Sequence, residues 1–386
     1  MQIRPLACAF LLILPTLHAA SFGERVQLRG GFDRSRAQFE QQKKGRVAFI
    51  GGSITEMDGY RPLVADILKK RFPETAFDFV NAGIASTCST TGAFRFASDV
   101  LAGGAPDLLF VEFAVNDDQD AAHTREECIR GLEGIVRQAR RAHPKMDFVI
   151  TYFVNEGTLK TLQSGGTPLP VEAHEAVAKH YGISTIHLGA EVAAEITDGK
   201  LTWEQYGGTH PAPFGNAIAA KMIDELLARA WAAPIAANDA LPQPLDPLSY
   251  EAGRFINPKL AQWKSGWTLG IPDWKSLPGG KRDRFTSIPI LSATEPGAEA
   301  TLEFAGTAVG AYIVAGPDAG IAEASVDGAA PRLVDLFHPY SAGLHYPRTV
   351  MFATDLAPGK HTLTLRISAD TKSAGHAARI MQFVAN

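Results

Sequence analysis

Short apolar runs alternate with longer amphipathic segments from Arg46 to about Leu227. Five of these runs are too apolar to have a solvated face, which indicates buried parallel strands. They are RVAFIG (46–51), AFDFVNAG (76–83), PDLLFVEFAVN (106–116), DFVITYFVN (147–155) and STIHLG (184–189). Between them, apolar residues recur at helical spacing over 60–72, 125–142, 170–181 and 213–230. Strand and helix in alternation predict βαβ units, so we expect an α/β domain with one open parallel sheet.

The pattern changes after a Pro-, Ala- and Asn-rich stretch at 233–247, which lacks periodicity and indicates a linker. Beyond it, Gly, Pro and Asp turns separate short β-type runs such as ATLEFAG, VGAYIVAG, EASVDG and ARIMQFVAN. Such runs favour a small antiparallel sandwich or jelly roll. We therefore expect an α/β domain over 21–232 and an all-β domain over 248–386, since 386 residues exceed what one core usually serves.

The first twenty residues have the pattern of a signal peptide. Arg4 precedes an apolar stretch from Leu6 to Leu17, and the small residues Ala19 and Ala20 follow. This stretch is too short to span a bilayer comfortably, so we expect cleavage and export to the periplasm or the cell exterior, without stable membrane insertion.

Composition and cysteine content restrict the partners and the compartment. The chain is 46% hydrophobic and 20% charged with a formal charge of -4, so it has no basic excess for binding nucleic acid. In an oxidising compartment Cys88 and Cys128 could form a disulfide, and the sequence leaves open whether they do. No CxxC pattern is present.

Four residues occur, in chain order, where an open parallel sheet usually places its active site. Ser53 follows two glycines after the first apolar run, Gly83 ends the second, and Asn116 ends the third. His210 precedes the final predicted helix, from where a loop side chain could reach Ser53. Each residue alone has an ordinary interpretation as a turn or cap residue. Their order at the carboxyl edge of one sheet, where sites form, is the informative feature.

This order resembles the SGNH, or GDSL-type, hydrolase superfamily over roughly residues 45 to 230. The resemblance implies a flavodoxin-like parallel sheet and serine esterase chemistry without a cofactor. It implies that Ser53 is the nucleophile and His210 the general base. The oxyanion hole would then consist of the N–H groups of Ser53 and Gly83 and the side-chain amide of Asn116.

The chain departs from this superfamily at Gly207, where members usually carry an aspartate three residues before the histidine. The residue that normally fixes the imidazole tautomer is therefore missing from its usual place. We predict a Ser-His dyad and leave open what orients the ring; in carbohydrate esterases of this superfamily that work with such a dyad, a backbone carbonyl can do so. Glu204 is the nearest alternative acid, and an exposed, solvated carboxylate is the competing interpretation.

Two His-containing segments fail as metal motifs. The run NDDQDAAH contains Asp117, Asp118, Asp120 and His123 but lacks the glycine and distal glutamate of a calcium loop. We interpret it as a solvated loop that enters a helix. In HEAVAKHY, His174 and His180 are six positions apart, whereas a helical zinc motif needs four, so we place both on helix surfaces. We expect no metal.

Aromatic side chains near the expected mouth of the site are Tyr60, Tyr152, Trp203, Tyr206 and Phe214. Of these we take Tyr60, Trp203 and Tyr206 as candidates for stacking on a sugar ring, against the alternative that they pack in the core.

These features together predict a secreted serine esterase that removes O-acetyl or other short acyl groups from a polysaccharide. The expected partner is an acylated carbohydrate, and the β-rich segment loosely resembles jelly-roll domains of some acetyl-esterase relatives. A lipase, phospholipase or thioesterase of the same superfamily is one alternative. A catalytically inactive, glycan-binding homologue is another, because of Gly207. The oligomeric state stays open.

Overall fold

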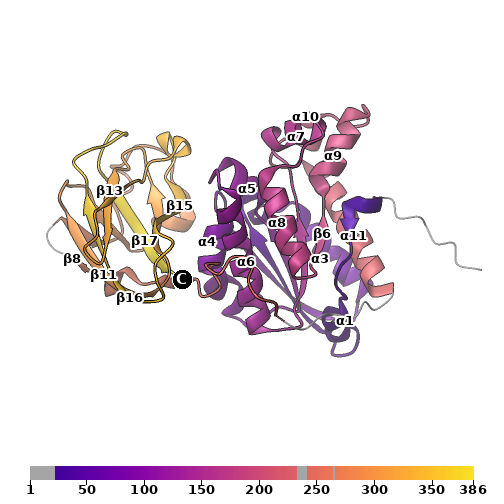
Figure 1. The fold of residues 1–386 in the computed structure, drawn as a ribbon. Helices are drawn as coiled ribbons and strands as arrows, with labels where there is room; N and C mark the ends of the chain where they lie inside the picture. The colour runs from indigo at the N-terminus through magenta and orange to yellow at the C-terminus, as the bar shows by residue number, and fades with distance from the viewer. Residues whose placement is uncertain (1–21, 233–240, 264–265) are drawn as a thin grey trace, which may run out of the picture.

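The computed structural model describes residues 22–232, 241–263 and 266–386 as two adjacent domains (Figure 1). The predicted signal peptide at 1–20 lies outside the described residues, as does the part of the predicted linker at 233–240. Among the described helices, none is both long enough and apolar enough to cross a membrane.

A six-stranded sheet forms the centre of the N-terminal domain. Its strands are β1 (Val26–Gln27), β2 (Lys44–Gly51), β3 (Ala76–Gly83), β4 (Leu108–Glu112), β5 (Asp147–Thr151) and β6 (Ser184–Ile186). The order is β1-β6-β5-β4-β2-β3, and only the short edge strand β1 is antiparallel. The chain leaves β2 to one side for β3 and then crosses to β4 on the other side. This is the flavodoxin-like arrangement predicted from the sequence, and its switch point lies between β2 and β4.

Helices cover both faces of this sheet. Residues Val47 and Phe49 of β2 pack in one hydrophobic cluster, and Ala48 and Ile50 pack in the other, because successive strand side chains point to opposite faces. The first cluster contains residues of α1 (Asp33–Glu40), α3 (Tyr60–Arg71), α9 (Leu188–Thr197) and α11 (Pro213–Ala232). The second contains residues of α4 (Ser89–Phe96), α6 (Arg125–Ala142) and α8 (Leu169–His180).

Four shorter helices lie near the carboxyl ends of the strands. They are α2 (Ser53–Glu56) after β2, α5 (Ala114–Gln119) after β4, α7 (Glu156–Gln163) after β5, and α10 (Trp203–Tyr206) before α11. The sequence patterns identified α3, α6, α8 and α11 but not α9, and the short helices lack enough turns to show a period.

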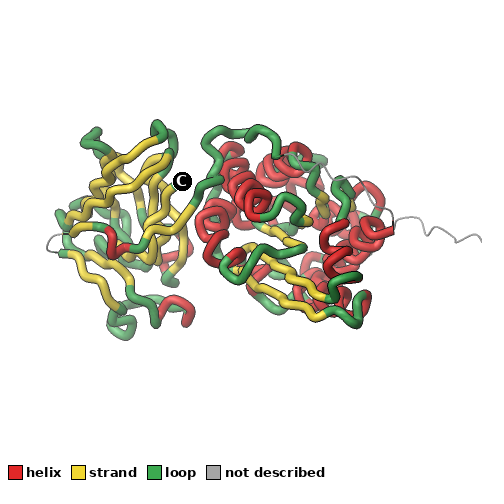
Figure 2. The backbone as a smooth tube through the Cα atoms, turned by 90° about the horizontal axis from the view of Figure 1, so that it is seen from below, coloured by secondary structure: helices red, strands yellow, loops and turns green. Residues whose placement is uncertain are grey.

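The C-terminal domain is an antiparallel β-sandwich, as predicted (Figure 2). One sheet contains β7 (Arg254–Ile256), β9 (Trp267–Gly270), β10 (Ile290–Ala293), β12 (Val309–Ala315), β15 (Tyr346–Ala353) and β17 (Ala378–Ala385). The other contains β8 (Gln262–Trp263), β11 (Glu299–Gly306), β13 (Ile321–Val326), β14 (Arg332–Asp335) and β16 (Gly359–Ile367). Alternate residues of both sheets, such as Leu302, Leu363 and Phe383, form the core between them. A short helix, α12 (Asp283–Thr286), lies outside the sandwich core.

The two domains share a hydrophobic cluster. The sandwich residues Ile290, Tyr312 and Met381 belong to the same cluster as Phe94 of α4 and Leu132 of α6. Figure 1 shows the β domain, orange to yellow, directly beside α4 and α6. The shared cluster fixes the relative position of the two domains, because each domain covers apolar surface of the other and keeps it away from water.

The described part of the predicted linker is bound to α6. The buried carboxylate of Glu133 accepts hydrogen bonds from the N–H groups of Leu245 (2.6 Å) and Asp246 (2.9 Å). The Asp246 side chain in turn accepts from Nε of Arg130 at 2.7 Å. Residues that show no periodicity in the sequence are thus ordered by side chains of the helix they cross.

Glu112, the last residue of β4, is a buried acid below the β2–α2 turn. It accepts hydrogen bonds from the N–H of Gly52 and from Oγ1 of Thr55 (3.4 Å), while its Oε1 has no partner in the described structure. Burial raises the pKa of this carboxyl to about 8, against the smaller opposing effects of the two hydrogen bonds. Glu112 is therefore mainly protonated at neutral pH.

This raised pKa predicts how stability depends on pH. In the unfolded chain Glu112 ionises near pH 4.5, whereas in the fold it holds its proton until about pH 8, so its contribution to the free energy of unfolding falls between these values. We expect Glu112→Gln to remove this loss, which is about 3 kcal/mol between pH 5 and pH 8. Urea unfolding at both pH values measures the difference between wild type and variant.

The exposed Glu303→Gln serves as the control for that measurement. It should differ from wild type by the same amount at both pH values. If Glu112→Gln behaves in the same way, Glu112 does not titrate as the structure indicates.

Candidate active site

Two glycines bring Ser53 to the carboxyl edge of the sheet. A Cβ on Gly51 would lie 2.2 Å from Oγ1 of Thr55, and a Cβ on Gly52 would lie 1.9 Å from Oδ1 of Asn116. No other residue fits at either position, because real Cβ atoms do not approach that closely. The chain can therefore turn directly from β2 into α2, and Ser53, half-buried, is the first residue of that helix.

His210 reaches Ser53 from the loop between α10 and α11. Its Nε2 is 2.8 Å from Oγ of Ser53, across 157 positions of sequence. The imidazole is exposed, and within the described residues the structure gives it no other hydrogen bond. The two side chains are thus within the distance that proton transfer between them requires.

The structure explains why position 207 carries no aspartate. Gly207 ends α10 in the left-handed region, with φ at 105°, and a Cβ there would lie 2.0 Å from the backbone nitrogen of Ala212. A side chain is excluded by both the backbone conformation and the lack of space. Glu204, the alternative acid, is exposed on α10 and makes no hydrogen bond to His210 among the described contacts. The Ser-His dyad stays a prediction.

Asn116 lies beside the nucleophile on α5. It is 1% exposed, and its Oδ1 faces the position where Gly52 has no side chain. Its Nδ2 donates to Oδ2 of Asp120 at 2.8 Å. One amide hydrogen therefore has a partner within α5, and the second has none among the described hydrogen bonds.

Gly83 lies on the other side of α2, at the end of β3. A Cβ there would lie 2.3 Å from the backbone nitrogen of Glu56, so glycine permits the close approach of this helix. The N–H of Gly83 donates to Oδ1 of Asn81 at 2.9 Å. An oxyanion could receive this N–H only if it displaced the Asn81 side chain. The structure thus brings Ser53, Gly83, Asn116 and His210 to one edge, where the N–H of Gly83 is already bound to Asn81.

The β domain borders this edge. A cavity of about 220 Å³ lies between α2, the segment after β3 and α12, and its lining is Glu56, Ile84, Ala85, Arg282, Asp283, Arg284 and Phe285. Arg282 donates to the carbonyl of Ala85 (2.9 Å) and to Oγ of Ser86 (3.0 Å), and Arg284 pairs with Glu56 at 2.9 Å. No local pattern in the sequence identifies these two arginines, because their partners are 197 and 228 positions away.

The predicted aromatic contacts require a correction. Tyr60 and Tyr206 are 1% and 0% exposed and belong to the core around α3 and α11, so neither ring offers a face to a sugar. Tyr152 is buried as well. Trp203 is half-buried and stacks on Tyr206, and Phe214 is exposed. The alternative interpretation, packing in the core, is therefore the correct one for Tyr60 and Tyr206.

The NDDQDAAH segment also differs from the prediction. Its first four residues belong to α5 rather than to a solvated loop, the other four follow that helix, and Asp117 is fully buried. Its carboxylate accepts from the N–H of Ser89 (2.7 Å) and from Oγ of Ser89 (2.6 Å), which anchors the start of α4. His174, predicted on a helix surface, is buried and lies 2.9 Å from Oδ2 of Asp117, whereas His180 is exposed.

Ligand-type side chains gather around Asp117. One triplet is Cys88, Asp117 and His123, and a second is Asp117, Cys128 and His174, with ligand atoms within 4.8 Å of one another in each. Burial disfavours the charged carboxylate, but the charge of His123 and hydrogen bonds from both histidines outweigh it and hold the pKa of Asp117 below its usual range. Such side chains can hold a transition metal, while here the Asp117 oxygens have hydrogen-bond partners. Both cysteines are free thiols.

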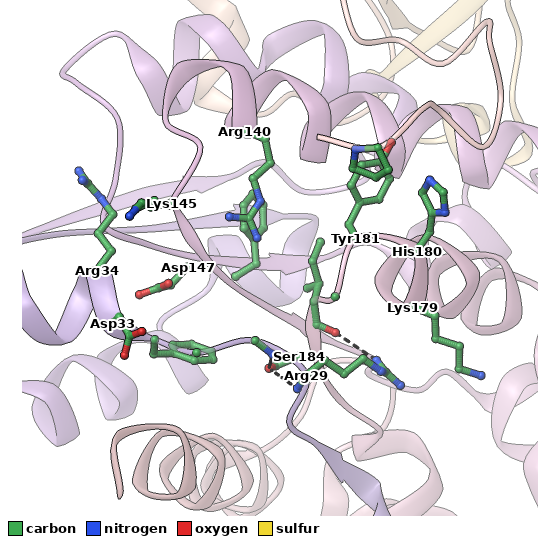
Figure 3. A pocket seen from close by; sticks show the side chains of 17 residues that line it. Arg29, Asp33, Arg34, Arg140, Lys145, Asp147, Lys179, His180, Tyr181 and Ser184 are labelled. Carbon is green, nitrogen blue, oxygen red and sulfur yellow. Dashed lines mark hydrogen bonds between the residues drawn. The ribbon is translucent and has the colours of Figure 1, made fainter. Parts of the chain in front are cut away.

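A larger cavity lies at the opposite edge of the sheet (Figure 3). It measures about 460 Å³ and is lined by residues at the amino ends of β5 and β6, including Asp147 and Ser184. Several cations surround it, such as Arg29, Arg34 and Lys179. Because Ser53 and His210 are at the carboxyl ends of the strands, this cavity is separate from the candidate active site.

Comparisons with known proteins agree with this geometry. Residues 49–218, which contain all four site residues, match the GDSL-like Lipase/Acylhydrolase family. The crystal structure of a two-domain esterase active on acetylated mannans, co-crystallised with mannopentaose, is 21% identical. It aligns over 93% of this chain and 96% of its own with a TM-score of 0.76, so both domains share its fold.

A smaller solved structure aligns with part of the chain. A catalytic mutant of Axe2, an acetylxylan esterase from Geobacillus stearothermophilus, is 20% identical and covers 47% of this chain and 94% of its own, with a TM-score of 0.38. No curated protein sequence matches the chain. The family match covers the residues that the fold brings together, so the α/β domain is similar to GDSL-like lipases and acylhydrolases, and the protein is a carboxylic ester hydrolase.

Proposed function

We propose that the protein is an exported esterase that removes O-acetyl groups from a polysaccharide, with Ser53 as nucleophile and His210 as general base. The observation that carries this proposal is the 2.8 Å contact between Nε2 of His210 and Oγ of Ser53. The esterase of similar two-domain fold acts on acetylated mannans, which supports an acetylated glycan as substrate. The predicted signal peptide supports export, since such polymers lie outside the cell.

The first half of the reaction acylates the serine. Oγ of Ser53 attacks the acetyl carbonyl carbon while Nε2 of His210 accepts the hydroxyl proton. The tetrahedral intermediate collapses when the bond to the sugar oxygen breaks, and the imidazolium returns the proton to that oxygen. A free sugar hydroxyl leaves, and the acetyl group stays on Ser53.

The second half restores the enzyme. His210 removes a proton from water, the resulting hydroxide attacks the acetyl-serine, and the proton returns to Oγ of Ser53 as acetate departs. During both halves the negative oxygen is stabilised by hydrogen-bond donors, each contributing about 3 kcal/mol. The N–H of Ser53 and the second amide hydrogen of Asn116 are two such donors. The third, the N–H of Gly83, would exchange the Asn81 oxygen for the oxyanion.

Substitution of the nucleophile tests the chemistry. We expect Ser53→Ala to lower acetate release from acetylated mannan, and hydrolysis of p-nitrophenyl acetate, by at least about 10³-fold, because no attacking oxygen is left. The exposed Ser164→Ala is the matched control and should retain wild-type rates. Full activity of Ser53→Ala would contradict the assignment.

Acyl-chain preference distinguishes the proposal from its alternatives. We expect faster hydrolysis of p-nitrophenyl acetate than of the decanoate, since the proposed substrate carries acetyl groups. A preference for decanoate would indicate a lipase. Glycan binding without acetate release or fluorophosphonate labelling of Ser53 would indicate an inactive binding protein. Acetylated xylan, mannan and pectin, compared side by side, identify the polymer.

An aspartate at position 207, where the superfamily usually has one, should not improve catalysis. We expect Gly207→Asp to lower the free energy of unfolding by at least about 2 kcal/mol without raising kcat, because a Cβ there meets both a positive φ and the backbone of Ala212. Thermal unfolding and kcat on p-nitrophenyl acetate measure the two effects. In the control Gly157→Ala the nearest atom is 3.4 Å away, so little change is expected. A faster, equally stable Gly207→Asp would show that the site accommodates a triad.

A further inference from the structure

A chain of two hydrogen bonds runs from the β domain to Asn116. Oη of Tyr346, on β15, donates to Oδ1 of Asp120 at 2.6 Å. Oδ2 of the same carboxylate accepts from Nδ2 of Asn116 at 2.8 Å. The three side chains are 2%, 8% and 1% exposed, so water competes little for these bonds.

Asp120 fixes the orientation of the Asn116 amide. An amide can rotate by 180° and exchange its oxygen and nitrogen, and only the nitrogen end can donate to an oxyanion. The carboxylate of Asp120 accepts from that end and would repel the oxygen end. With Nδ2 held in this way, Oδ1 faces Gly52 and the second amide hydrogen is available to the substrate.

Tyr346 fixes Asp120 in turn. Burial, together with the nearby charge of Asp120, raises the pKa of the Tyr346 phenol well above its usual range, so the hydroxyl keeps its proton and donates. The ring stacks on His338, with centroids 4.8 Å apart and planes 4° from parallel. Tyr346 is therefore held from the β domain, while the carboxylate that it contacts belongs to the catalytic domain.

We propose that Tyr346 is a positioning residue for the oxyanion hole, acting through Asp120 on the side-chain amide of Asn116. This inference rests on the proposed function, because it assigns Asn116 to stabilising the acetyl oxyanion. The β domain thus contributes to the rate of the chemical step and not only to holding substrate.

Contacts that do not involve Tyr346 also hold the two domains together. An effect of the Tyr346 hydroxyl on catalysis can therefore be distinguished from an effect on domain packing. Oγ1 of Thr91 donates to Oγ1 of Thr349 at 2.9 Å, and Arg284 pairs with Glu56. The shared hydrophobic cluster adds apolar contacts. Loss of one hydroxyl leaves all of these in place.

The test begins with Tyr346→Phe, which removes the hydroxyl and keeps the ring. We expect kcat on p-nitrophenyl acetate to fall about tenfold while KM stays within about twofold, because a loosely held donor affects the transition state more than the bound ester. Asn116→Ala should lower kcat by about 10² to 10³-fold. Thermal unfolding of each variant reports whether the fold is retained.

The double variant separates positioning from a merely structural role. If Tyr346 acts through Asn116, then Tyr346→Phe added to Asn116→Ala should change kcat by less than about twofold, since the group it positions is gone. A structural defect would lower kcat by the same factor in both backgrounds.

Tyr312→Phe is the matched control. Tyr312 is a buried tyrosine of β12 in the shared cluster, and its hydroxyl has no hydrogen-bond partner in the described structure. The same chemical change at this site should leave kcat unchanged.

Two outcomes would overturn the proposal: Tyr346→Phe with the kcat of wild type, or multiplicative effects of Tyr346→Phe and Asn116→Ala. Failure of the proposed function looks different, because the wild-type protein itself would then release no acetate. An active wild type with an unaffected Tyr346→Phe refutes the positioning role alone.

Discussion

The candidate active site depends on close packing at the end of β2, where the neighbouring residues leave no room for a side chain. Gly51 and Gly52 are pressed against Thr55 and Asn116 so closely that a Cβ at either position would overlap them. This contact lets β2 turn at once into α2, sets Ser53 at the start of that helix, and holds the amide of Asn116 beside it. The sheet order places β2 between β3 and β4, so the residues that end all three strands meet at the switch point.

The same edge is completed from the C-terminal domain. Arg282 and Arg284 bind the segment after β3 and the helix that carries Ser53, and Tyr346 reaches the helix that carries Asn116. The segments that follow β2, β3 and β4 are therefore each contacted by a residue of the C-terminal domain. Together with the shared hydrophobic cluster, these contacts hold the C-terminal domain against α4 and α6.

The sequence predicted the five parallel strands β2 to β6, the helices α3, α6, α8 and α11, and the order of Ser53, Gly83, Asn116 and His210, because apolar runs and strand-end motifs are local signals. It failed where burial depends on a distant element. His174 lies on an amphipathic helix, and nothing local shows that Asp117 of α5 covers it. Tyr60 and Tyr206 were misread for the same reason, since packing around α3 and α11 decides their exposure. The bond from Tyr346 to Asp120 spans 226 positions and leaves no sequence signal. Gly207, seen as a missing acid, proved to be a position without room for any side chain.

The hydrophobic cluster that continues from α4 and α6 into the sandwich also limits motion. Swinging the domains apart would expose this apolar surface to water, which makes a hinge between them unfavourable. The contacts that Arg284 and Tyr346 make across the boundary are therefore kept as the molecule moves, and the two domains behave as a single rigid body around the candidate site.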